Sequence, residues 1–100
     1  MKYQDRKLEK LCTDERVMRK KRGDIADKLR RRVNALRTAE TVGDLSTIDP
    51  LGYWHQLHED HAGEWAGKLS DNYRLLIRPE GDSDSWNAVT VTVIDIDDYH

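Results

Sequence analysis

The chain has 100 residues, a net charge of −2 and a mean hydropathy of −0.87, which predict one small globular domain over residues 1–100 with a thin core. No apolar run approaches the roughly 18–20 residues of a membrane span, and the first residues lack the apolar stretch of a signal peptide. A single cysteine, Cys12, excludes an intramolecular disulfide and a cysteine-rich zinc site. These features favour a cytoplasmic protein with no membrane partner.

The net charge hides a strong asymmetry between the two parts of the chain. Residues 1–39 carry 14 Lys and Arg against 6 Asp and Glu, a net of +8, whereas residues 40–100 carry 3 against 13, a net of −10. Such an asymmetry indicates that the basic part faces a polyanion, although a solvated pair of amphipathic helices would look similar. The candidate docking residues are Arg30, Arg31, Arg32 and Arg37.

Two helices are predicted in the basic part. Apolar residues at helical spacing predict an amphipathic helix from about Asp5 to Arg22, with Gly23 at its end. Asp24 is expected to cap a second helix, which ends near Ala39. Because the turn between them is short, the two helices are expected to form an αα-hairpin that keeps the arginines of the second helix outside.

The hydrophobic period changes from 3.6 to 2 after a connector over residues 40–52. Strands are expected at 53–58, 64–69, 73–78 and 88–97, with a short one at 2–4. The order βααββββ predicts an α+β fold, in which the helical hairpin packs on one face of a small, twisted, mostly antiparallel sheet and leaves the other face open for chemistry.

The strand predicted at 88–97 has apolar residues on both faces, as is typical of a central strand. Regular alternation along it would place Asp98 and His100 on one face, opposite to Tyr99. The side chains expected to share that face with them are Thr92, Ile94 and Ile96.

The late histidines are candidates for proton transfer. His55, His58 and His61 are spaced by three residues, but a strand would point His55 and His58 to opposite faces and no cysteine accompanies them, so no metal site is expected. Metal-free RNA cleavage needs one group that takes the proton from the 2′-OH, another that protonates the leaving 5′-oxygen, and a cation for the phosphorane. Arg74 is the candidate cation, with an ion pair to Asp95 or Asp97 as its alternative role.

Six segments, in the same order along the chain, resemble one known family. They are residues 7–12, 32–41, 55–58, 63–66 and 72–77, and the final Asp98-Tyr99-His100, which is the most specific. Together they resemble the HigB-like branch of the RelE/ParE superfamily of bacterial toxins. This resemblance implies a RelE-like fold and the toxin of a type II toxin–antitoxin system, a ribosome-dependent endoribonuclease that cleaves mRNA without a cofactor. It also implies a cytoplasmic antitoxin partner encoded by an adjacent gene.

The resemblance assigns roles by position. The implied catalytic residues are His55, Arg74, Asp98, Tyr99 and His100, and His58 and Arg78 are possible substrate contacts. Two alternatives stay open: a ParE-like toxin that binds DNA gyrase, and a non-catalytic member that only binds a partner. Because ParE-like chains lack the histidine-rich set, the final tripeptide and His55 favour the nuclease.

Overall fold

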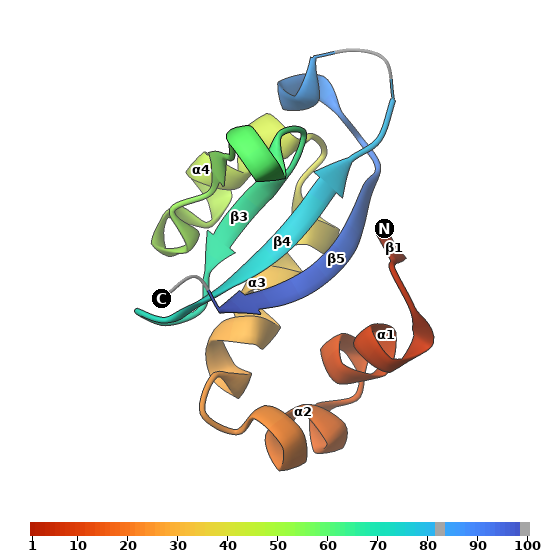
Figure 1. The fold of residues 1–100 in the computed structure, drawn as a ribbon, viewed down its shortest axis with the longest axis vertical. Coiled ribbons are helices and arrows are strands. Elements are labelled where there is room, and N and C mark those ends of the chain that lie inside the picture. Colours follow the sequence, from red (N-terminus) through yellow and green to blue (C-terminus); the bar gives the residue numbers. More distant parts are fainter. Residues whose placement is uncertain (82–83, 99–100) are drawn as a thin grey trace.

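A five-stranded sheet with helices on one face forms the fold (Figure 1). The computed structural model describes residues 1–81 and 84–98. The strands are β1 (Lys2–Tyr3), β2 (His55–Gln56), β3 (Trp65–Lys68), β4 (Tyr73–Pro79) and β5 (Val91–Asp98). They follow the spatial order β1-β5-β4-β3-β2, in which only β1 and β5 pair in parallel among the described strands. The predicted α+β class and mostly antiparallel sheet are confirmed, and β5 lies inside the sheet as its two-sided apolar pattern predicted.

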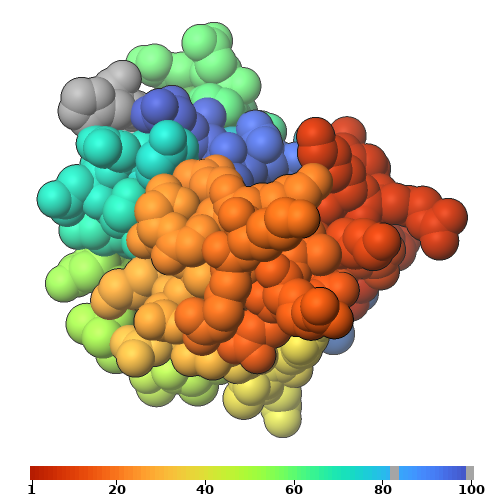
Figure 2. Space-filling model, turned by 90° about the horizontal axis from the view of Figure 1, so that it is seen from below, coloured from red at the N-terminus to blue at the C-terminus, as the bar shows by residue number. Residues whose placement is uncertain are grey.

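The helices occupy the face that is turned away from the viewer in Figure 1. They are α1 (Arg6–Thr13), α2 (Glu15–Arg22), α3 (Ala26–Thr38) and the short α4 (Leu45–Ile48). Their apolar stripes pack with the helix-facing side of β4 and β5 in the main core, which includes Cys12, Leu29, Val33, Leu75 and Val93. Figure 2 shows α2 and the start of α3 closing the lower end of the molecule.

The first predicted helix is broken in two at Asp14. This residue has extended backbone (φ −104°, ψ 108°), and it both ends α1 and caps α2. Its Oδ1 accepts hydrogen bonds from the amides of Arg16 at 3.0 Å and Val17 at 3.3 Å. The prediction of one continuous helix is therefore wrong, because an aspartate satisfies exposed amides at a helix start better than it serves a helix interior.

The start of α3 and the connector also differ from the prediction. Ile25, rather than Asp24, is the N-cap residue, while Asp24 pairs with Arg22 at 3.4 Å. The connector is structured: besides α4 it contains 3₁₀ turns at Val42–Asp44 and Pro50–Gly52. Val42 and Leu45 are buried in the main core, so burial of these two side chains orders a segment whose turn residues had predicted only a loop.

A β-bulge in β5 reverses the predicted alternation of its side chains. Ile77 pairs with Val93 while its neighbour Leu76 pairs with Asp95, so β5 holds one extra residue at this point. Before the bulge Val91 and Val93 face the helices; after it Ile96 does so, whereas Ile94 packs on the other face. The expectation that residues 92, 94, 96 and 98 share one face is therefore wrong.

The face of the sheet away from the helices is partly covered, although the sequence predicted an open face. Leu57, Ala66 and Leu76 are buried there as a second apolar cluster, with Ile94 packed against them. Only His55–Gln56 is strand in the region predicted as 53–58, although Leu57 still donates its amide to Glu64 O at 2.8 Å. The polar side chains of this face surround an apolar centre.

Arg32 is buried, with 2% of its surface exposed, and it joins three segments of the chain. Its Nε donates to Lys68 O at 2.7 Å, its Nη1 to Asp49 Oδ1 at 2.8 Å and its Nη2 to Leu51 O at 3.0 Å. The second oxygen of Asp49 accepts from Trp54 Nε1 at 2.9 Å. Arg32 was predicted to lie outside as a docking residue; that prediction is wrong, because its guanidinium satisfies buried carbonyls and a carboxylate.

Replacing Arg32 by alanine is expected to lower the free energy of unfolding by about 3–5 kcal/mol, since removal of one partner leaves the other charge buried and unpaired. Urea unfolding followed by circular dichroism measures this loss. The control is Arg31→Ala, at the neighbouring exposed position, which is expected to change stability by less than about 0.5 kcal/mol. Equal effects of the two substitutions would contradict the role assigned to Arg32.

The thiol of Cys12 is expected to be unreactive in the native protein. Burial raises its pKa from 9.0 to about 12, so the nucleophilic thiolate is scarce at neutral pH. Labelling with a chromogenic disulfide reagent at pH 8 should therefore be slow and should accelerate in step with unfolding by urea. Because the unfolded thiol ionises first, stability should also fall as the pH rises above about 9. Rapid labelling without denaturant would contradict this.

Candidate functional site

The acidic part of the chain places its positive charges on one face of the sheet. Lys68 lies directly opposite Arg74 in the β3–β4 pairing, and Arg78 lies on the same face of β4 four residues further on. These three are all the Lys and Arg residues of positions 40–100. They lie on the same side as the second apolar cluster, and this face, called here the cationic face, also carries the carboxylates of Asp95 and Asp97.

His55 lies on the cationic face at the β2 edge of the sheet. It pairs with Ala66, which faces that side, and its imidazole is exposed. His55 Nδ1 is 2.8 Å from the carbonyl oxygen of Tyr53. Because a carbonyl can only accept, Nδ1 carries the hydrogen, and in the neutral ring Nε2 is the basic nitrogen. The backbone carbonyl therefore fixes the tautomer and leaves Nε2 as the nitrogen that can accept a proton.

Arg74 is held by an ion pair with the neighbouring strand. Its Nε donates to Asp97 Oδ2 at 2.9 Å, and the two side chains are 18% and 24% exposed. This is one of the two ion-pair partners that the sequence suggested. The partly buried carboxylate fixes the guanidinium on the cationic face, and it also offsets part of its positive charge.

Asp98 lies on the opposite side of the sheet from Arg74. Asp98 is opposite Tyr73 in the pairing of β5 with β4, and Tyr73 packs against the helix-side core, whereas Asp97 is opposite Arg74. The bulge therefore exchanges the expected positions of Asp97 and Asp98. Tyr99 and His100, the other two residues of the catalytic prediction at this end, lie outside the described residues.

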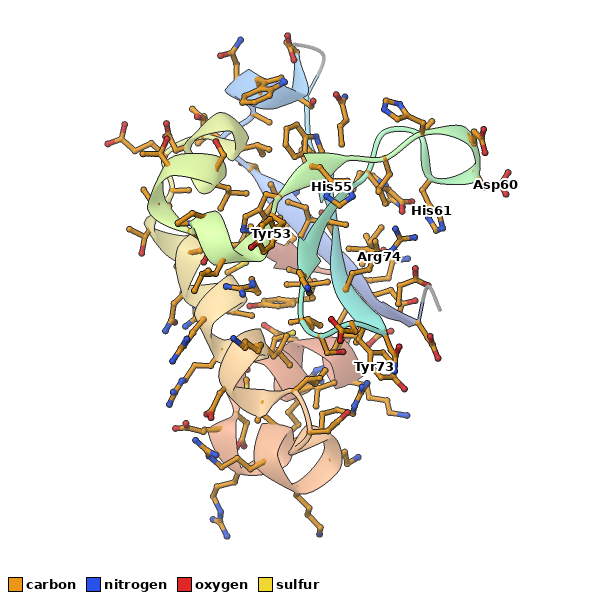
Figure 3. The ribbon with its side chains drawn as sticks, turned by 90° about the vertical axis from the view of Figure 1, so that its left-hand side faces the viewer. Tyr53, His55, Asp60, His61, Tyr73 and Arg74 are labelled. Carbon is orange, nitrogen blue, oxygen red and sulfur yellow. The ribbon has the colours of Figure 1, made fainter. Side chains whose placement is uncertain are left out.

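His61 is a second histidine whose tautomer is fixed by a hydrogen bond, and the sequence analysis did not identify it. His61 Nδ1 is 2.9 Å from Glu64 Oε1, and Glu64 lies on the cationic face two residues before Ala66. Figure 3 views the sheet from its β2 edge and shows His61 and Arg74 on the same side of it. The three-residue spacing of His61 and Glu64 in the sequence could have suggested their contact. However, the two residues flank a turn, and hydrophobic periodicity does not predict the path of the chain through a turn. His58 and Arg78, the possible substrate contacts, are both exposed.

The docking arginines of α3 have different environments. Arg31 and Arg37 are exposed. Arg30 is partly occupied, since its Nη1 donates to Glu15 Oε1 at 2.9 Å and its Nη2 is 3.6 Å from Asp27. With Arg32 buried, the exposed positive charge of α3 that is available to a polyanion comes mainly from Lys28, Arg31 and Arg37.

Within residues 1–81 and 84–98, no cluster of three or more His, Cys, Asp or Glu side chains is arranged to hold a metal ion. No helix in this part of the chain is long and apolar enough to cross a membrane.

Comparison with known proteins shows the fold. No family model matches the sequence, and neither does any curated protein. Among solved structures, the YoeB/ParE toxin from Agrobacterium tumefaciens is similar: the match covers 87% of each chain with a TM-score of 0.53 and 16% sequence identity. The fold is therefore that of a RelE/ParE-like toxin, as the resemblance implied. The likeness is one of fold, and the HigB-like branch stays a prediction.

Proposed function

We propose that this chain is the toxin of a type II toxin–antitoxin pair and that it cleaves mRNA on the ribosome. The observation that carries the proposal is the cationic face, on which His55, with a fixed tautomer, lies on the same side of the sheet as Lys68, Arg74 and Arg78. The similarity in fold to a protein described as a YoeB/ParE toxin supports the toxin assignment. The HigB-like segments of the sequence support the nuclease.

The chemistry follows from these groups. His55 Nε2 takes the proton from the 2′-hydroxyl, which then attacks the adjacent phosphorus. Arg74 stabilises the negative charge that builds on the phosphorane, while Asp97 keeps its guanidinium in place. His100 protonates the leaving 5′-oxygen in this proposal, with the help of Tyr99, whereas Asp98 faces the helix side of the sheet and takes no part in this step. No metal or other cofactor takes part.

The partners follow from the same proposal. The exposed arginines of α3 contact ribosomal RNA, the cationic face receives the mRNA, and an antitoxin encoded by an adjacent gene blocks one of these surfaces in the cytoplasm. Gyrase binding is the competing activity, because the similar structure carries both names, YoeB and ParE. The exposed imidazole of His55, with its oriented base nitrogen, favours proton transfer over simple protein binding.

Replacing His55 by alanine is expected to lower the rate of mRNA cleavage on programmed ribosomes by about 10²–10⁴-fold, since a general base is removed. Stability should change by less than about 0.5 kcal/mol, because the side chain is exposed. The matched control is Gln56→Ala, the exposed neighbour that points to the other face of β2, which should keep most of the activity. Growth arrest by wild type with induction of the DNA-damage response and intact mRNA would instead support gyrase binding.

Replacing Arg31 or Arg37 by glutamine is expected to lower the affinity for ribosomes. The affinity should also depend less steeply on the salt concentration. For each phosphate that the variant no longer neutralises, the slope of log affinity against log salt should become shallower by about 0.7–0.9. Sedimentation with ribosomes over a range of salt concentrations measures this slope. The charge-matched substitutions Lys2→Gln on β1 and Lys10→Gln on α1 should leave it unchanged. An equal decrease in all four variants would show that only total charge matters and would contradict docking through α3.

A further inference from the structure

Tyr53 combines two features that are unfavourable for stability. Its ring is 63% exposed, and its backbone lies in the left-handed region (φ 46°, ψ 43°), which bulky residues rarely adopt. A glycine or asparagine would fit this backbone better. A left-handed backbone at an exposed aromatic residue makes Tyr53 a candidate functional position.

The surroundings of Tyr53 connect it to the candidate site. Its carbonyl oxygen accepts from His55 Nδ1, and Lys68 Nζ lies 5.7 Å from the centre of its ring. Two residues of chain span at most about 7 Å, so the Cα atoms of Tyr53 and His55 lie within that distance of each other. Figure 3 shows Tyr53 and His55 together along the β2 edge.

A pocket of about 420 Å³ adjoins the ring of Tyr53. The polar side chains that line it with Tyr53 include Lys28, Lys68, Ser70, Asp24 and Asp71. Lys68 is also 3.5 Å from Asp71 Oδ1. Carboxylates beside ammonium groups disfavour a phosphate but offer both acceptors and donors to the edge of a neutral base or to ribose hydroxyls. The volume lies within the ~300–1,000 Å³ of small-molecule pockets.

We propose that Tyr53 is a stacking platform for the nucleobase that flanks the scissile phosphate, with Lys68 on the ring and the adjoining pocket receiving the edge of the base. This inference rests on the proposed cleavage of RNA and assigns the substrate subsite beside His55. Stacking on an aromatic ring tolerates every base because each has a π-face, whereas removal of the ring weakens binding by about 5- to 150-fold.

The test uses the full chain with ribosomes programmed with a synthetic mRNA, and it measures the single-turnover rate and the half-saturating concentration. Tyr53→Phe keeps the ring and should stay within about twofold of wild type. Tyr53→Asn suits the left-handed backbone but lacks the ring, so half-saturation should rise about 5- to 150-fold while the melting temperature stays the same or increases. The control Ile48→Ala, at another exposed apolar residue outside the pocket, should leave both parameters unchanged.

A second arm replaces the flanking nucleotide by an abasic one. Wild type should then lose as much affinity as Tyr53→Asn loses on normal mRNA, whereas the variant should lose little more. Equal losses in the two proteins, unchanged half-saturation in Tyr53→Asn, or an effect confined to antitoxin binding would overturn the inference. If Tyr53→Asn fails to fold, Tyr53→Gly takes its place in the abasic comparison, because glycine also suits the left-handed backbone and lacks the ring. Failure of wild type to cleave any mRNA would reject the proposed function itself.

Discussion

The buried guanidinium of Arg32 is the interaction on which the candidate site depends. It joins α3 to the carboxylate of Asp49, to Leu51 O and to Lys68 O at the end of β3. Asp49 in turn holds the indole of Trp54, which lies across Gly67 so closely that a Cβ there would meet the ring at 2.6 Å. These contacts hold the residues before Tyr53, Asp49 and Leu51, and the residue after it, Trp54. The path of residues 49–54, and with it the position of His55, thus depends on a charge buried between α3 and the end of β3.

The charge asymmetry of the sequence has a different meaning in the folded chain. The acidic part carries few cations, yet Lys68, Arg74 and Arg78 lie on one face because β3 and β4 pair in the register that aligns Lys68 with Arg74. Glu64 and Asp97 on that face pair with His61 and Arg74 and orient those side chains, whereas Asp95, opposite Leu76 in the β4–β5 pairing, is exposed. Net charge over a stretch of sequence is therefore a poor guide to the potential of one surface, since strand pairing decides which charges meet.

The sequence predicted the elements whose signal is periodic, and it missed those determined by a single contact. α3, β4 and β5 follow from regular spacing of apolar residues, and the alternation of Arg74, Leu76 and Arg78 placed them correctly on one face. The break at Asp14 and the burial of Arg32 depend on individual hydrogen bonds, which a period does not contain. Tyr53 was missed for a related reason: its left-handed backbone follows from the turn at Pro50–Gly52, which itself depends on Arg32.

The bulge in β5 shows how one inserted residue decides the make-up of the site. With regular alternation Asp98 would lie on the face of Thr92 and Ile94; with the bulge that place falls to Asp97, whose carboxylate meets Arg74 at 2.9 Å. The apolar centre explains why the bulge is stable, because it lets Ile94 cover Leu76 and Ala66 while Ile96 still packs in the main core. The same backbone irregularity thus satisfies two hydrophobic clusters and supplies the arginine with its partner. The position of the candidate cation follows from core packing, and the chemistry of the cationic face is in this respect a consequence of how the sheet buries its apolar residues.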